Sequence, residues 1–167
     1  DTSGDDPCAI DADDPNAGYT CGVMSNETVI AATFNKDLAW EYGVTMGDYS
    51  LWANLPIYWA ASANIHRLPY NARNHEYYSE DPMLTGMMGV AVTLGIQSQG
   101  VGVSAKHFAV NSQENERTKV DERVSQRALR ELYLRGFERL VREADPWTLM
   151  SAYNRINGQY TEELVAL

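Results

Sequence analysis

Apolar residues recur at intervals of three and four along two segments of the chain, which is the pattern of helices with one buried face. These segments are residues 36–52 and 122–143. A third helix is predicted over residues 82–97 from its ends, because Asp81 before Pro82 supplies an N-cap and a favourable first helical residue, and Gly100 is a suitable C-terminal glycine. A fourth, shorter helix is predicted to follow an N-cap at Ser25 or Asn26.

Three short apolar runs have the length of strands, namely residues 55–60, 101–108 and 147–153. Residues 62–80 and 154–160 are rich in polar and turn-forming residues and are predicted to be loops. The order strand, helix, strand, helix, strand predicts an α/β fold of parallel β/α units. In such folds the ligand-binding residues gather in the loops that follow the carboxyl ends of the strands.

Hydrogen-bond donors follow each of the predicted strands. Arg73 comes after the first strand, Lys106 and His107 end the second, and Tyr153 ends the third. Such a set at one end of a sheet suits a ligand with many hydroxyls or an anionic group. Neighbouring residues of a regular strand point to opposite faces, so we expect a strained or cis peptide between Lys106 and His107 if both reach one ligand.

Each of these side chains also has a purely structural interpretation. A single lysine or histidine at a strand end is usually solvated or structural, and Arg73 can hold its long loop together by pairing with Glu76 or Glu80. The recurrence of donors at equivalent places in successive units favours binding. The sequence leaves both interpretations open for each residue.

Carboxylates and cofactor motifs add little to this picture. Asp81 is better explained as a helix cap, and Glu114, Glu116 and Arg117 as an ion-pair network in a loop than as an acid/base pair. The acidic run at residues 11–20 does not fit a calcium-binding EF-hand loop. No cysteine and histidine spacing is typical of zinc, and no glycine loop is typical of phosphate binding, so we predict no metal and no cofactor.

The formal net charge of −10 argues against nucleic acid and anionic membrane as partners. The acids concentrate near the N-terminus, which predicts an irregular acidic arm over residues 1–24 and a domain over residues 25–167. Cys8 and Cys21 lie in the arm, where they either pair or remain free thiols. No apolar run reaches the roughly 20 residues of a membrane span. A soluble protein is therefore expected, either cytoplasmic or secreted.

Four segments together resemble the catalytic barrel domain of glycoside hydrolase family 3, the family of many β-glucosidases. The resemblance covers roughly residues 25–160, and the second and third segments are the most specific in combination. In chain order the segments are FNKDLAWEYG, NIHRLPYNARNHEYYSEDPMLTG, SAKHFAVNSQENER and TLMSAYNRINGQY.

The resemblance implies a retaining hydrolase that cleaves β-linked glucosyl or related β-glycosyl residues without a redox cofactor. By motif match, the family's sugar-binding roles fall on Arg73, Lys106, His107 and Tyr153, with Met150 close by. It further implies a β-glucoside or oligosaccharide as substrate. A distorted backbone in the family lets the lysine and the histidine face the same sugar.

Neither catalytic carboxylate of the family is matched in this chain. The nucleophilic aspartate, in a Ser/Thr-Asp-Trp segment, and the acid/base are expected beyond Leu167. A complete (β/α)8 barrel needs about 250 residues, so the chain is expected to form an incomplete TIM barrel, with sheet edges unpaired. We therefore expect the chain alone to be inactive, and the rest of the barrel and a further domain in a parent protein. The alternative is a non-catalytic carbohydrate-binding fragment or truncated relative.

Overall fold

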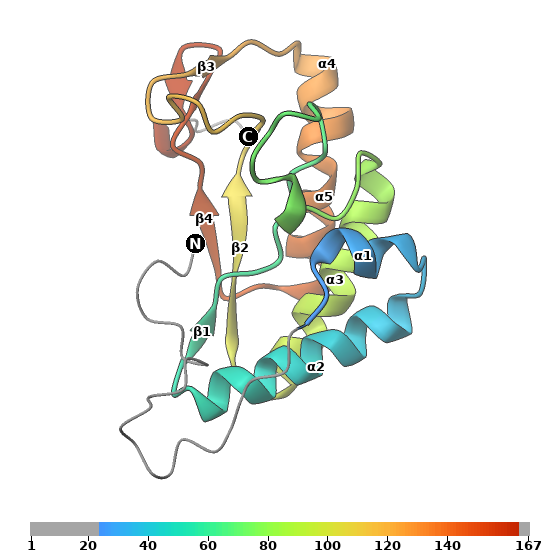
Figure 1. The fold of residues 1–167 in the computed structure, drawn as a ribbon. Helices are drawn as coiled ribbons and strands as arrows, with labels where there is room; N and C mark the ends of the chain where they lie inside the picture. The colour runs from blue at the N-terminus through green and yellow to red at the C-terminus, as the bar shows by residue number, and fades with distance from the viewer. Residues whose placement is uncertain (1–23, 164–167) are drawn as a thin grey trace, which may run out of the picture.

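The computed structural model of the protein describes residues 24–163. The acidic arm predicted for residues 1–24, with Cys8 and Cys21, lies outside the described residues except for Met24. Figure 1 shows a parallel sheet with the helices gathered on one side of it. This is the α/β architecture that the alternating pattern predicts.

The main sheet has three parallel strands in the order β1–β2–β4. The central strand is β2 (Gly102–Phe108), and its neighbours are β1 (Ile57–Tyr58) and β4 (Thr148–Ser151). Strand β2 is buried along nearly its whole length, as expected for a continuous apolar run between two neighbours. The carboxyl ends of β2 and β4 lie at the top of Figure 1, so the loops that follow these strands meet there.

Two helices precede β1 along the chain, α1 (Glu27–Ala32) and α2 (Lys36–Trp52). A third, α3 (Pro82–Ser98), lies between β1 and β2. Their predicted N-caps are confirmed, because the side chain of Asn26 accepts from the Val29 amide at 3.1 Å and that of Asp81 from the Leu84 amide at 3.1 Å. The last helical segment consists of four pieces, two of them π-helical, with a turn at Leu134 between the second and the third piece. They are α4 (Gln126–Ala128), η2 (Leu129–Tyr133), α5 (Arg135–Arg139) and η3 (Leu140–Ala144).

Two predicted boundaries are wrong, and both errors have one cause. The last helix was expected from residue 122, yet residues Asp121–Glu122 form strand β3, which pairs with β5 (Arg155–Ile156). Strand β5 in turn pairs with β6 (Gln159–Tyr160), so the predicted loop at residues 154–160 is a hairpin. Its turn residues Asn157 and Gly158 have φ of 50° and 95°, the backbone that an Asn-Gly hairpin turn requires.

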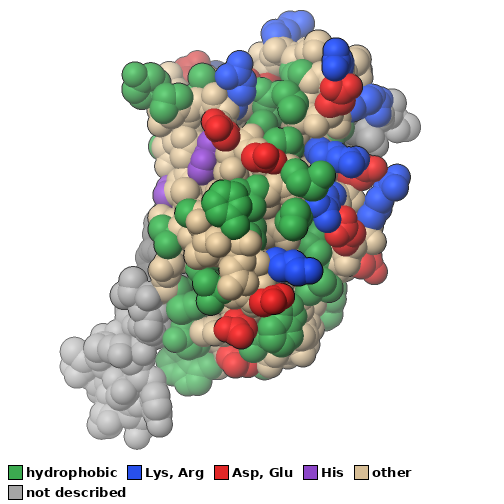
Figure 2. Space-filling model, turned by 90° about the vertical axis from the view of Figure 1, so that its right-hand side faces the viewer, with side chains coloured by type: hydrophobic (Ala, Val, Ile, Leu, Met, Phe, Trp, Pro, Cys, Tyr) green, Lys and Arg blue, Asp and Glu red, His purple; other side chains and the backbone are tan. Residues whose placement is uncertain are grey.

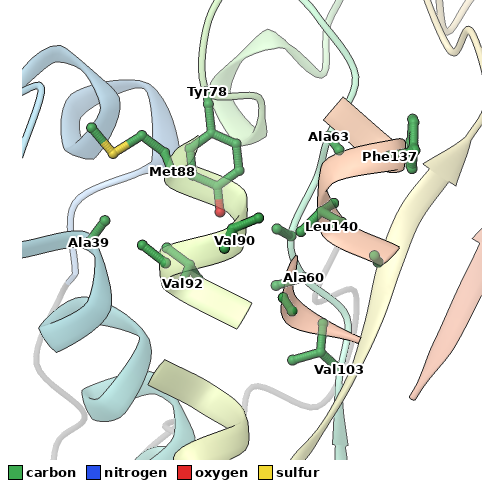
Figure 3. Packing of buried hydrophobic residues seen from close by; sticks show 14 of the residues in the cluster. Ala39, Ala60, Ala63, Tyr78, Met88, Val90, Val92, Val103, Phe137 and Leu140 are labelled. Carbon is green, nitrogen blue, oxygen red and sulfur yellow. The ribbon is translucent and has the colours of Figure 1, made fainter. Parts of the chain in front are cut away.

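Helices α2 and α3 pack with their backbones in contact. A Cβ at Gly43 of α2 would overlap the carbonyl of Val92, and one at Gly95 of α3 would overlap the carbonyl of Trp40. The core around this contact is shown in Figure 3, where Val92 lies beside the α2 helix. Small residues therefore set the spacing of these two helices.

The helical side of the molecule combines exposed apolar and charged side chains (Figure 2). Phe34, Met83 and Met87 line a surface hollow of about 430 Å³ on this side, bounded by Lys36 and Asp81. Within residues 24–163, no helix is both long and apolar enough to cross a membrane.

Candidate functional site

The loop between β1 and α3 carries the first group of functional candidates, and it is held by hydrogen bonds to two of its carbonyls. His66 Nε2 donates to the Asn74 carbonyl at 2.8 Å and to the Tyr77 carbonyl at 3.0 Å. Thr28 Oγ1 of α1 donates to the same two carbonyls, at 3.2 and 2.8 Å. The short 3-10 helix η1 (Asn74–Glu76) lies between them, so Arg73 and Glu76 project from a fixed backbone.

The end of β2 is fastened to the same loop by one buried amide side chain. Asn64 Oδ1 accepts from the His107 amide at 2.8 Å, and Asn64 Nδ2 donates to the His107 carbonyl at 3.0 Å. The peptide bond between Lys106 and His107 is cis, which confirms the expectation of a strained or cis peptide there. Both main-chain groups of His107 are thus fixed by Asn64.

Glu76 joins the cationic candidates of two strand ends. Its Oε2 lies 2.8 Å from Lys106 Nζ, and its Oε1 accepts a hydrogen bond from Arg73 Nε. Of the two partners considered for Arg73, the structure therefore has Glu76. Burial raises the pKa of Glu76, but the hydrogen bonds and charges of Arg73 and Lys106 outweigh it and lower that pKa to about 2. Glu76 is a permanent anion that holds both cations in place.

His107 is a buried and neutral imidazole. Burial, together with the positive charges of Arg73 and Lys106, lowers the pKa of His107 to about 3. Its ring meets the Tyr77 ring edge to face, with centroids 6.5 Å apart. Among the described residues its Nδ1 has no hydrogen-bond partner. Lys106 and His107 thus contact neighbouring residues of the same loop, Glu76 and Tyr77.

The loop after β2 adds a second ion-pair group. Arg117 Nη1 lies 3.0 Å from Glu114 Oε2, which confirms the predicted pairing of these residues, while Glu116 pairs with Lys119 instead. The other oxygen of Glu114 lies 3.7 Å from Arg73 Nη1. The Arg117 guanidinium lies 5.0 Å from the centroid of the Tyr153 ring. Tyr153 is therefore linked to Arg73 through two intervening side chains.

Met150 lies in β4 directly beside Lys106, its register partner in β2. The five residues predicted to bind a ligand thus fall into one neighbourhood at the ends of the strands. Arg73 and Lys106 share a carboxylate, His107 follows Lys106, Met150 flanks Lys106, and Tyr153 is joined to the group through Arg117.

Sequence reasoning missed two parts of this site. It considered Glu76 as a candidate partner of Arg73 and as one of several acids, but not as the carboxylate that Arg73 and Lys106 share. It missed Asn64 altogether, and no local pattern identifies this residue, because its partner is 43 positions away.

The arrangement offers fixed donors and a neutral imidazole to a ligand. The carboxylates of Glu76 and Glu114 are engaged by cations, so neither of these two is free to transfer a proton or to attack a substrate. In residues 24–163 there is no group of three or more histidine, cysteine, aspartate and glutamate side chains that could hold a metal ion. A neutral, hydroxyl-rich molecule fits such a set of donors.

Comparison with known proteins agrees with this chemistry. The model of the family described as glycosyl hydrolase family 3 N-terminal domain matches residues 14–164. Beta-glucosidase A of Butyrivibrio fibrisolvens is 40% identical over 149 residues, which are 89% of this chain and 18% of that protein. An exo-alpha-(1->6)-L-arabinopyranosidase of Bifidobacterium breve is 42% identical over 134 residues, 80% of this chain and 18% of that protein.

Solved structures give the same result. Beta-glucosidase 3B of Thermotoga neapolitana in complex with glucose superposes with a TM-score of 0.86 at 45% identity, over 93% of this chain and 22% of that one. The beta-glucosidase of Kluyveromyces marxianus in complex with glucose gives a TM-score of 0.82 at 38% identity, over 83% of this chain and 17% of that one.

The chain spans about a fifth of the length of these relatives, 18% to 22% of the first ones compared. Its parallel β/α units are a portion of a TIM-barrel-like fold, which corresponds to the predicted fold class. With a match over most of its residues, the chain belongs to glycosyl hydrolase family 3 and forms part of the N-terminal domain of that family.

Proposed function

We propose that this chain forms part of the active site of a β-glucosidase-like hydrolase and grips the sugar whose glycosidic bond is cleaved. The observation that carries the proposal is the pairing of Arg73 and Lys106 with one carboxylate, next to the neutral His107. These donors are pre-organised by Glu76 and Asn64 before any ligand arrives, which reduces the entropy lost on binding.

Each side chain then has a defined task. Arg73 and Lys106 donate charge-assisted hydrogen bonds to sugar hydroxyls, and the neutral ring of His107 donates from one nitrogen without adding charge. Met150 supplies an apolar contact beside Lys106, and Tyr153 supplies a phenol at the rim. The sugar is a β-linked glucosyl or related β-glycosyl residue, and a β-glucoside or oligosaccharide is the substrate.

The reaction proposed for the parent protein is hydrolysis with retention, which needs a carboxylate nucleophile and a second carboxyl as acid/base. Glu76 suits neither role, because its pKa of about 2 keeps it ionised and both of its oxygens hold cations. We therefore assign both catalytic groups to parts of the parent protein outside this chain. The 167-residue chain alone is then a sugar-binding piece without turnover.

The first test compares the full-length protein with the 167-residue chain on p-nitrophenyl β-glucoside. We expect hydrolysis by the former only, with β-configured glucose as the first product in NMR spectra. Turnover by the chain alone would contradict the assignment of the nucleophile. A full-length protein that binds glucose but hydrolyses no glycoside would favour the non-catalytic carbohydrate-binding alternative.

The second test removes one donor. Lys106→Met in the full-length protein is expected to lower kcat/KM by roughly 10- to 100-fold, because a charge-assisted hydrogen bond at a desolvated site is lost. Lys119→Met is the matched control, since Lys119 is an exposed lysine of the next loop that pairs with Glu116. Equal activity of the two variants would remove Lys106 from the sugar site.

A further inference from the structure

Arg117 lies in the loop after β2, and two contacts hold its side chain. Its Nη1 donates to Glu114 Oε2 at 3.0 Å, and its guanidinium lies 5.0 Å from the centroid of the Tyr153 ring. A planar guanidinium over an aromatic face is a favourable cation–π contact. Arg117 therefore connects the loop after β2 with Tyr153, the second residue beyond β4.

The carboxylate behind Arg117 is itself fixed. Glu114 Oε1 accepts from Asn111 Nδ2 at 3.4 Å and lies 3.7 Å from Arg73 Nη1. Asn111 is buried and also donates to the Tyr77 hydroxyl at 2.9 Å. The chain of contacts from the buried loop to the rim leaves Arg117 little rotational freedom.

Tyr153 has no such support of its own. Its exposed fraction is 61%, and among the described residues it makes no hydrogen bond, so the Arg117 stack is what restrains its ring. An exposed tyrosine without a partner samples several rotamers, and ordering it on ligand binding reduces affinity.

We propose that Arg117 is a positioning residue, which holds the Tyr153 ring in its sugar-binding orientation without itself contacting the sugar. The proposal rests on the proposed function, because it assigns Tyr153 to the sugar site. Contacts through Glu114 and Arg117 link Tyr153, beyond β4, to Arg73, beyond β1. The distance between these two donors is thereby restrained.

The steady-state test uses the full-length protein. Arg117→Ala is expected to raise KM roughly three- to tenfold, as for loss of a cation–π restraint, while kcat changes less than about twofold, because substrate and transition state lose the same contact. Arg117→Lys is expected not to restore KM, because an ammonium has no plane to stack. Arg127→Ala is the matched control, since Arg127 is an exposed arginine paired with Glu131 on the outer helix. An unchanged KM in Arg117→Ala would overturn the proposal.

A double-mutant cycle shows whether Arg117 acts through Tyr153. In the Tyr153→Ala background, the further change Arg117→Ala is expected to leave KM unaltered, since there is no ring left to position. The same fold-change in both backgrounds would mean that Arg117 contacts the sugar or supports the fold. That result would overturn the positioning role.

A measurement without substrate separates this proposal from the proposed function. With ¹³C-labelled tyrosine, the ring resonances of Tyr153, assigned through Tyr153→Phe, are expected to move in Arg117→Ala and to stay in place in Arg127→Ala. If the Tyr153 resonances do not move in Arg117→Ala, and this variant has the same thermal midpoint as the wild type, the proposal that Arg117 restrains Tyr153 is overturned. If the wild type hydrolyses no glycoside, the proposed function fails, and these resonances alone decide whether Arg117 positions Tyr153.

Discussion

At the scale of single residues, His107 shows how its surroundings keep a histidine uncharged. The ring is buried beside two cations, and burial and the charges of Arg73 and Lys106 both oppose its protonation. A histidine with a folded pKa of about 3 has lost the acid/base usefulness that this residue has near neutral pH. His107 therefore stays neutral across the whole physiological range.

The same pKa makes stability depend on pH in a defined direction. Because the folded pKa of His107 lies below its ordinary 6.5, the unfolded state binds a proton that the folded state does not, and stability is lost as pH falls from 6.5 towards about 3. The expected contribution of His107 to the slope is at most about 1.4 kcal/mol per pH unit. Urea denaturation of the wild type and of a variant without His107, between pH 7 and 5, measures it.

His107→Asn should remove the histidine's contribution, while His75→Asn, at an exposed position of the same site loop, is the matched control. The difference between the wild type and His107→Asn isolates the histidine, because Glu27, whose pKa burial raises to about 6, contributes a slope of opposite sign in the same range. Glu76, with its pKa lowered to about 2, contributes only as pH falls below its ordinary value of 4.5. The same pH dependence in the wild type and in His107→Asn would show that His107 does not cause it.

The residues of the site were predictable where they depend on strand position, and not where they depend on the path of a loop. Arg73 and Tyr153 follow two of the parallel strands and Lys106 lies near the carboxyl end of the third, and these ends must share one edge of the sheet. Glu76 and Asn64 acquire their partners only because a long aperiodic loop folds back on β2. No helical or strand period encodes such a fold-back.

At the scale of elements, the contact between α2 and α3 depends on two glycines. The backbones approach so closely that a methyl group has no place at Gly43 or Gly95. A helix interior normally prefers alanine to glycine by about 1 kcal/mol. Close packing therefore outweighs helix propensity at these two positions.

Two alanine substitutions within α3 test this balance. Gly95→Ala is expected to destabilise the protein by about 1 to 3 kcal/mol, because the new methyl group meets the Trp40 carbonyl, a backbone atom that cannot move aside alone. Gly89→Ala is expected to be neutral or slightly stabilising, since its Cβ would lie 3.4 Å from the Ala61 side chain. The free energy of unfolding from denaturant titration decides, and equal values for both would refute the packing argument.

Element boundaries followed the same division between local and distant causes. The helices at residues 36–52 and 82–97 were predicted almost to the residue, since the apolar spacing of the first and the end signals of the second are local. The start of the last helix was misplaced because Asp121 and Glu122 pair with a strand more than 30 residues away. The hairpin at residues 155–160 had a local signal in its Asn-Gly turn, which the loop interpretation passed over.

At the scale of the whole molecule, the sheet is a segment of a barrel with two open sides. Among the described residues, β1 and β4 each pair with β2 and with no strand beyond it. Apolar side chains remain exposed along these outer strands and just beside them, with exposed fractions of 66% for Trp59, 62% for Trp147 and 43% for Leu149. Unpaired edges with apolar side chains promote association.

The isolated chain is therefore expected to self-associate and to bind the hydrophobic dye ANS, and the full-length protein is expected to do neither to the same degree. Sedimentation velocity at rising concentration measures the association. Leu149→Ser should weaken it, whereas Leu51→Ser, at an exposed position of α2, should not. A strictly monomeric chain that ignores the dye would mean that the open edges are covered in another way.

The two hydrogen bonds between the Asn64 side chain and the His107 backbone have a consequence for protein engineering. Because Asn64 holds the backbone of His107 and Glu76 holds Lys106 across a single β/α unit and the strand that follows it, the proposed sugar-binding group cannot be grafted as isolated point substitutions. A designer who wishes to install it in a foreign barrel must transplant residues 57–108 as one cassette. Recombination libraries should likewise place their crossover points outside that block.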